Sequence, residues 1–223
     1  MLPHLDARLA AAASLVREGQ AAADIGCDHG KLTAYLTGGG RCPKVIGADL
    51  RAGPLARAQQ TLRAAGLENA AELRLGDGLQ VLAPGEVGTI VLAGVSAQTT
   101  IGILAAAPWV YAAGGPRLVL VPATKHAVLR RWLYEKGYVL VRDLPVEAAG
   151  RWYAVLAAEP TGVPRAPESI SLADCVYGKT GAEPGGAAYA ALARAKLRRE
   201  RRGLADGSEA ARAVDALLAA QPQ

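Results

Sequence analysis

Apolar residues follow two alternating patterns along the first two thirds of the chain. Short continuous apolar runs, typical of buried strands, alternate with longer segments in which apolar residues recur at helical spacing. Glycine or proline separates the two kinds of segment, so the alternation predicts a parallel sheet with helical crossovers. The predicted strands are residues 22–25, 45–48, 73–75, 89–93 and 117–121, and the predicted helices are residues 5–16, 31–36, 54–65, 98–107 and 125–136.

Two more apolar runs follow at residues 138–144 and 152–158, and only a short connection separates them. Such a short connection predicts an antiparallel hairpin, because a parallel pair needs a long crossover. We therefore expect an α/β fold with a Rossmann-like sheet of seven strands, in which the first helix, although interrupted by Asp6 and Arg8, precedes the first strand.

The alternation of predicted strands and helices ends after residue 159. Four prolines between residues 160 and 185 break any long element there. We expect three parts: a large α/β domain over residues 1–159, a Pro-rich linker with one short helix near 171–176 over residues 160–185, and a helical hairpin over residues 186–223. Asp206 or Ser208 is the expected N-cap of the last helix.

A glycine-containing loop joins the first predicted strand to the next helix. The residues are Asp24-Ile25-Gly26-Cys27-Asp28-His29-Gly30. Glycines let the backbone turn sharply, and amides at the helix start favour an anionic group of a nucleotide-like cofactor.

Two acidic turns sharpen this prediction. Asp49 ends the second strand, where its carboxylate can accept hydrogen bonds from ribose hydroxyls, and Asp77 lies between Gly76 and Gly78 after the third strand, at the expected adenine edge. This order is that of S-adenosylmethionine (SAM) methyltransferases, whereas the alternative is a Gly-rich turn with two capping aspartates.

Composition narrows the class of protein. The chain has 51% hydrophobic residues, which is enough for a buried core, and a net charge of +5 that permits a polyanionic partner. It shows no apolar run of membrane-spanning length, no signal-peptide pattern and no metal-type cysteine spacing, so we expect a cytoplasmic protein without membrane or metal partners. The oligomeric state stays open, with a monomer as one option.

The first helix of the C-terminal hairpin is strongly basic. Its cluster consists of Arg194, Lys196, Arg198, Arg199, Arg201 and Arg202, against the single acid Glu200. Contact with RNA phosphates would account for such a cluster, and a solvated helix surface is the alternative.

The segment LDARLAAAASLVREGQAAADIGCDHGKLTAYL resembles the opening of the bacterial tRNA adenine-N1 methyltransferases of the TrmK family, which modify adenine 22. RLGDGLQVL, LRRWLYEKGYVL and ESISLADCVYG are also similar to that family, so the resemblance covers nearly the whole chain. It implies a class I methyltransferase domain with a helical C-terminal extension, SAM as cofactor, S-adenosylhomocysteine as product and tRNA as partner.

The site residues follow from the loops and from the resemblance. The expected cofactor-binding residues are Asp24, Gly26, Cys27, Asp28, Gly30, Asp49, Leu50, Gly76, Asp77, Gly78, Ala93 and Gly94. Asp28 is the first candidate for stabilising the charge that develops on a methylated adenine, with His29 as its neighbour. Arg8 is expected to face substrate phosphate or base. The alternatives are a helix-start hydrogen bond for His29 and a solvated helix-face charge for Arg8.

The acceptor side departs from the family. Ala93-Gly94-Val95-Ser96-Ala97 replaces the family's Ala-Gly-Met-Gly-Gly, and Val121-Pro122-Ala123 replaces Gln-Pro-Asn. The added Cβ atoms are expected to hinder approach of a base, and an amide that could bind a base edge is lost. Three hypotheses remain: a tRNA adenine-N1 methyltransferase, a SAM-dependent methyltransferase with another substrate, and a SAM- or RNA-binding protein without catalysis.

Overall fold

The computed structural model describes residues 1–220 and contains one sheet of seven strands. Their order across the sheet is β3-β2-β1-β4-β5-β7-β6, and β7 is antiparallel to both of its neighbours. This arrangement confirms the predicted α/β class and the final hairpin. The strands are β1 (Ala22–Ile25), β2 (Val45–Asp49), β3 (Glu72–Leu75), β4 (Thr89–Ala93), β5 (Arg117–Val121), β6 (Tyr138–Ala148) and β7 (Arg151–Pro160).

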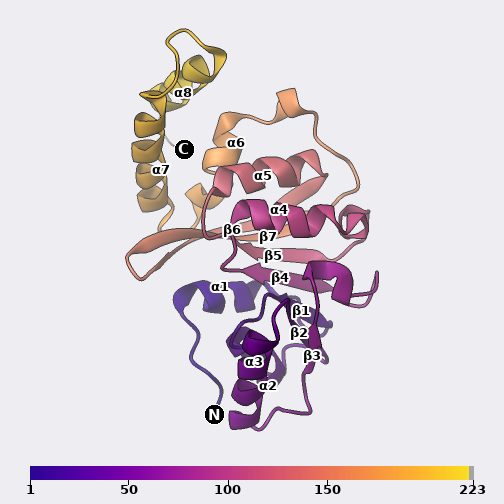
Figure 1. Cartoon of the computed structure of the whole chain (residues 1–223). Coiled ribbons are helices and arrows are strands. Elements are labelled where there is room, and N and C mark those ends of the chain that lie inside the picture. The colour runs from indigo at the N-terminus through magenta and orange to yellow at the C-terminus, as the bar shows by residue number, and fades with distance from the viewer. Residues whose placement is uncertain (221–223) are drawn as a thin grey trace.

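Helices cover both faces of the sheet (Figure 1). One face carries α1 (Ala7–Leu15), α2 (Lys31–Gly38) and α3 (Ala52–Ala64), and the other carries α4 (Ala97–Ala105) and α5 (His126–Glu135). All five predicted helices are confirmed, with ends that differ by a few residues. Asp6 does not interrupt α1 as expected, because its carboxylate caps the helix by accepting from the amides of Arg8 and Leu9.

Two apolar cores hold these layers together. Leu92, Leu118 and Leu120 point to the α4–α5 side, whereas Val91 and Val119 point to the α1–α2 side. Consecutive residues of a strand face opposite sides, so β4 and β5 must be apolar on both faces. This double burial accounts for their continuous apolar runs.

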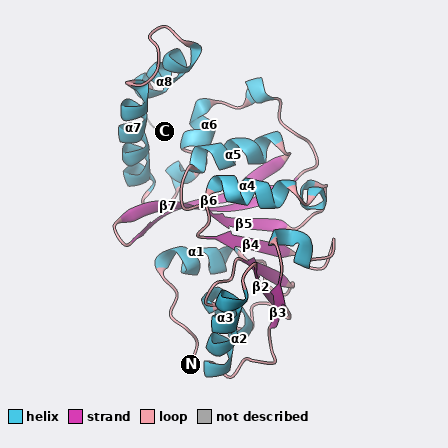
Figure 2. Ribbon diagram, in the orientation of Figure 1, coloured by secondary structure: helices cyan, strands magenta, loops and turns pink. Residues whose placement is uncertain are grey.

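The β6–β7 hairpin is longer than the sequence predicts. Pro145 lies inside β6 and pairs with Ala154, where a strand end was expected. A proline lacks the amide needed to join a central ladder, and β6 tolerates it because β6 is the last strand of the sheet. Figure 2 shows this hairpin projecting past its neighbours toward the base of α7 (Gly186–Arg201).

The C-terminal segment forms the expected short helix and helix pair. Ser171 and Asp174 form a capping box on α6 (Leu172–Val176), and Ser208 rather than Asp206 caps α8 (Glu209–Ala219). The Arg194 guanidinium on α7 donates to the carbonyl groups of Leu217, Leu218 and Ala220 at the end of α8. The two helices therefore pack as a hairpin.

A buried ion pair joins this segment to the sheet. Arg130 on α5 donates to both carboxylate oxygens of Asp143 on β6, each at 2.9 Å, and neither side chain is exposed. Arg130 also donates to the carbonyl groups of Cys175 and Val176 and to the Tyr189 hydroxyl on α7. One guanidinium thus links α5, β6, α6 and α7.

Candidate active site

A cavity of about 760 Å³ opens at the carboxyl ends of the parallel strands. This edge is where open α/β sheets bind ligands. The cavity is lined by residues from the predicted loops and the N-terminal segment: His4, Asp6, Arg8, Leu9, Asp24, Ile25, Gly26, Cys27, Asp28, His29, Lys31, Leu32, Ala48, Asp49, Leu50, Arg51, Gly76, Asp77, Gly78, Ala93, Gly94, Val95, Thr99 and Ile103. Of the described residues predicted to bind cofactor, only Gly30 does not line it.

The glycines at the site have two different structural roles. Gly26 and Gly94 have φ values of +76° and +85°, and a Cβ at either would meet no atom within 4 Å, so both face open space at the cavity. Gly30 has a φ of +65°, but its Cβ would lie 2.7 Å from that of Ala58 on α3. Gly30 therefore permits close packing of the loop on α3.

Asp49, at the end of β2, binds the glycine loop that follows β1. One carboxylate oxygen accepts from the backbone amide of Arg51 at 3.0 Å, and the other accepts from the amide of Asp28 at 3.3 Å. Asp28 reaches this position with a φ of +47°, which is uncommon for a residue with a side chain. The side chain of Asp49 is thus fixed in orientation before any ligand binds.

Asp24 is a buried acid behind the loop. It is 4% exposed, and one of its oxygens accepts from the Thr33 hydroxyl at 2.8 Å. Burial raises the pKa of Asp24 to about 6; the Thr33 hydroxyl opposes the shift and the nearby Asp49 charge adds to it. A cationic group in the cavity would favour the ionised form of this acid.

Charged residues from the N-terminal segment and from the glycine loop line the cavity. The Arg8 guanidinium pairs with Asp6 at 2.6 Å and lies 4.9 Å from the ring centre of Tyr153 on β7. The Asp28 carboxylate is 60% exposed and lies 3.7 Å from His29 and 3.8 Å from Arg57. The three residues predicted for catalysis thus line one cavity, and Asp28 and His29 are in contact.

The three residues that differ from the family, Val95, Ser96 and Ala97, do not all face the cavity. The Ser96 hydroxyl accepts from the Thr99 amide and caps α4, while Ala97 is fully buried in the α4-side core. Of the three altered positions, only Val95 lines the cavity. The expectation that the Cβ atom of Ala97 hinders a base is therefore wrong, because that atom points into the core.

The basic cluster on α7 divides into two groups. Arg194 binds carbonyl groups of α8, Arg201 pairs with Asp206 and Asp215, and Lys196 lies 3.7 Å from Glu200. Among the described residues, no carboxylate pairs with Arg198, Arg199 or Arg202, and all three are exposed. This second group therefore has no carboxylate to displace before it could bind an external anion, whereas Lys196 is exposed beside Glu200.

Sequence reasoning missed His4, Thr99 and Ile103, which also line the cavity. Thr99 and Ile103 lie one turn apart on α4, so their spacing could have indicated a shared face. His4 precedes every predicted element, and nothing in the sequence indicates that the chain before α1 returns to the cavity.

Comparison with known proteins agrees with this geometry. Residues 5–156 match the family described as methyltransferase domain. The chain is 33% identical over 168 residues to the tRNA (adenine(22)-N(1))-methyltransferase of Bacillus subtilis (strain 168), a match that covers 75% of this chain and 70% of that protein.

Two solved structures share the fold over almost the whole chain. Streptococcus pneumoniae Sp1610, in complex with S-adenosyl-L-methionine, has a TM-score of 0.78 at 27% identity and covers 95% of this chain and 98% of its own. The B. subtilis M1A22 tRNA methyltransferase TrmK has a TM-score of 0.70 at 26% identity and covers 97% and 95%.

The strand order, the cavity and the matching family define a class I methyltransferase. Within that class, the chain belongs to the tRNA (adenine(22)-N(1))-methyltransferase family.

Proposed function

We propose that this protein binds SAM in the 760 Å³ cavity and transfers its methyl group to N1 of an adenine in tRNA, namely adenine 22. The observation that carries the proposal is the order of groups around the cavity: an open glycine loop, a preset acid at the end of β2 and an aspartate in the turn after β3. The relative from B. subtilis supports the choice of tRNA and of adenine 22.

The residues present fit this cofactor. Asp49 has its carboxylate held by two amides and can accept from ribose hydroxyls. Asp77 and the exposed Leu50 line the cavity and would contact the adenine ring, and the Asp24 carboxylate would pair with the ammonium group of the methionine part. The open space at Gly26 and Gly94 leaves room for the ligand beside the backbone.

Methyl transfer requires alignment more than covalent help. The adenine N1 lone pair forms the new bond to the methyl carbon, the carbon–sulfur bond breaks with its electrons left on sulfur, and the ring becomes cationic. The Asp28 carboxylate would stabilise that charge, and His29 would help orient Asp28. Arg8, held by Asp6 and Tyr153, would bind substrate phosphate or base. N1 lies on the pairing edge, so the base must leave its stack.

The test is methylation of unmodified tRNA with labelled SAM, followed by nucleoside mass spectrometry. We expect 1-methyladenosine in tRNA that carries adenine 22 and none in a matched tRNA with guanine at that position. Methylation of both tRNAs would overturn the assignment to adenine 22. Binding of SAM without methylation of either tRNA would overturn the assignment of tRNA as the substrate.

The three cysteines support a reducing compartment. Cys27, Cys42 and Cys175 are all buried free thiols, as expected for a protein of the cytoplasm, where tRNA is also found. Burial raises the pKa of the Cys27 thiol well above its usual range, so this cavity-lining group stays protonated. Among the described residues, no helix combines the length and the hydropathy that a membrane-spanning segment requires.

A further inference from the structure

The turn that carries Asp77 leaves the edge strand of the sheet. β3 is the outermost strand beside β2, and the chain from Gly76 to Gly88 must run from its carboxyl end back to the start of β4. The Gly76 amide donates to the Asp49 carbonyl at 3.1 Å, but Asp77 and Gly78 lie beyond the strand pairing. Something other than the sheet must therefore hold this turn against the cavity.

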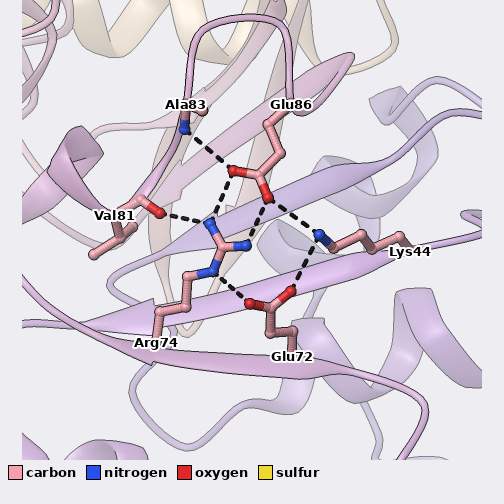
Figure 3. A network of polar contacts seen from close by, with 6 residues as sticks. All are labelled: Lys44, Glu72, Arg74, Val81, Ala83 and Glu86. Carbon is pink, nitrogen blue, oxygen red and sulfur yellow. Dashed lines mark hydrogen bonds and ion pairs between the residues drawn. The ribbon is translucent and has the colours of Figure 1, made fainter.

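Arg74 on β3 ties together both ends of that segment (Figure 3). Its guanidinium donates to the Val81 carbonyl at 2.6 Å and to the two carboxylate oxygens of Glu86 at 2.6 and 2.9 Å. Glu86 also accepts from the Ala83 amide at 3.1 Å, and Lys44 pairs with Glu86 and Glu72. Arg74 thus closes the loop between residues 74 and 86.

The contact with Val81 extends to the turn itself. A Cβ on Gly76 would lie 2.5 Å from Cγ1 of Val81, so the backbone of the turn rests directly on that side chain. A Cβ on Gly78 would lie 3.1 Å from Cγ2 of Ile103 on α4. The turn therefore packs closely against both Val81, whose carbonyl group binds Arg74, and α4.

We infer that Arg74 and Glu86 are positioning residues for the cofactor site, which hold Val81 and thereby preset Asp77 against the adenosine end of the ligand. The inference rests on the proposed cofactor, and neither side chain lines the cavity itself. The alternative role is protection of an exposed strand edge by charge, which would not affect ligand affinity.

The geometry favours the positioning role over a simple surface salt bridge. Exposed ion pairs contribute little to stability, but Arg74 and Glu86 are only 22% and 19% exposed in their side chains, and they bind each other in a bidentate manner. Hydrogen bonding from Arg74 lowers the pKa of Glu86 to about 2, so this acid stays ionised at neutral pH.

The chain offers a closely matched control. Arg117 on β5 donates to Glu159 and to the Leu15 carbonyl, and its side chain is 24% exposed. Like Arg74, it joins a strand to a glutamate and a backbone carbonyl, although Arg74 also binds Glu72 at 2.7 Å, and Arg117 does not line the cavity. Arg74→Met and Arg117→Met therefore remove similar interactions, an Arg–Glu pair and a hydrogen bond to a carbonyl, at two places.

The experiment is titration calorimetry of each variant with S-adenosylhomocysteine, beside thermal unfolding. We expect Arg74→Met to bind about tenfold more weakly, the scale of one lost hydrogen bond at Asp77, and Arg117→Met to bind like the wild type. Arg74→Lys keeps the charge but not the forked geometry, so it should also bind more weakly than the wild type. Wild-type affinity in Arg74→Met or Arg74→Lys would overturn the inference.

A double-mutant cycle tests the route through Asp77. If Arg74 acts by placing Asp77, then Arg74→Met should add little weakening in an Asp77→Ala background. Full additivity would overturn this route. If Arg74→Met does not fold, Glu86→Gln replaces it, with an expected loss of about threefold because the Val81 contact remains. Failure of the wild type and Arg117→Met to bind the ligand would instead overturn the proposed cofactor, and the positioning role with it.

Discussion

Two aspartates from neighbouring strands lie together at the carboxyl edge of the sheet, and their environments differ. Asp49 accepts from two backbone amides, whereas Asp24 is buried with one hydroxyl donor. The same side chain therefore serves two purposes: Asp49 stays a preset acceptor, and Asp24 is an acid whose charge depends on what occupies the cavity.

We expect Asp49→Ala to weaken binding of S-adenosylhomocysteine by roughly 2–4 kcal/mol, because each hydrogen bond to a charged acceptor contributes about 1.5–3 kcal/mol and water replaces part of it. Calorimetry measures the loss, and Glu68→Ala, at an exposed acid outside the cavity lining, is the control. Equal affinity in Asp49→Ala and the wild type would contradict the ribose assignment.

The raised pKa of Asp24 predicts that ligand binding depends on pH. Its folded-state pKa of about 6 lies above the ordinary value of 3.8. The contribution of Asp24 to the free energy of unfolding is therefore fully present below about pH 4 and is lost as the pH rises through 6. Attraction for a ligand ammonium has the opposite sign, because it needs the ionised form. Affinity for S-adenosylhomocysteine should therefore fall between about pH 7.5 and about pH 5 in the wild type, and this dependence should disappear in Asp24→Asn. The same slope in both proteins would exclude Asp24 as its source.

At the level of elements, the start of α4 decides what the altered loop can do. Ser96 caps the helix and Ala97 is buried in the core, so of the three altered residues only Val95 lines the cavity. The Ala123 amide holds the loop by donating to the Val95 carbonyl at 2.9 Å. The departures from the family pattern therefore differ in whether they change the lining of the cavity.

We expect Val95→Met with Ala123→Asn to raise turnover on tRNA, whereas Ser96→Gly with Ala97→Gly should not. The second pair should instead lower stability, because glycine costs about 1 kcal/mol in a helix and leaves a gap at the buried Ala97. Steady-state kinetics with saturating SAM and urea unfolding separate the two effects. A gain in turnover from the glycine pair would show that Ser96 and Ala97 do restrict the acceptor base.

The α7 helix carries the second element-level prediction. Arg198 and Arg199 are exposed and have no carboxylate partner among the described residues, so Arg198→Ala/Arg199→Ala should weaken tRNA binding and reduce its salt dependence, since fewer counterions are released. Arg63→Ala/Lys136→Ala removes the same charge from exposed positions elsewhere. Equal salt slopes for the two double variants would assign Arg198 and Arg199 to the solvated surface.

For the whole molecule, the Arg130 cluster is the joint between the sheet and the C-terminal helices. Arg130→Met leaves Asp143 buried without its cation, so we expect a loss of about 3–5 kcal/mol in the free energy of unfolding. The double variant Arg130→Met/Asp143→Leu should recover much of that loss, because no unpaired charge remains. Urea unfolding measures both, and a double variant no more stable than the single one would show that the hydrogen bonds, rather than the paired charge, hold the joint.

The sequence by itself determined the strands, the helices and the loops of the cavity, because apolar periodicity and the turn residues Gly26, Asp49 and Asp77 are local signals. Only the tertiary structure showed that Gly30 serves packing on Ala58, that Ala97 faces the core and that Arg194 and Arg201 bind within the helical hairpin. These roles depend on contacts between residues far apart in the chain or on the direction of one side chain. Identical residue types can therefore face a ligand, a core or a carbonyl group, and the sequence pattern is the same in each case.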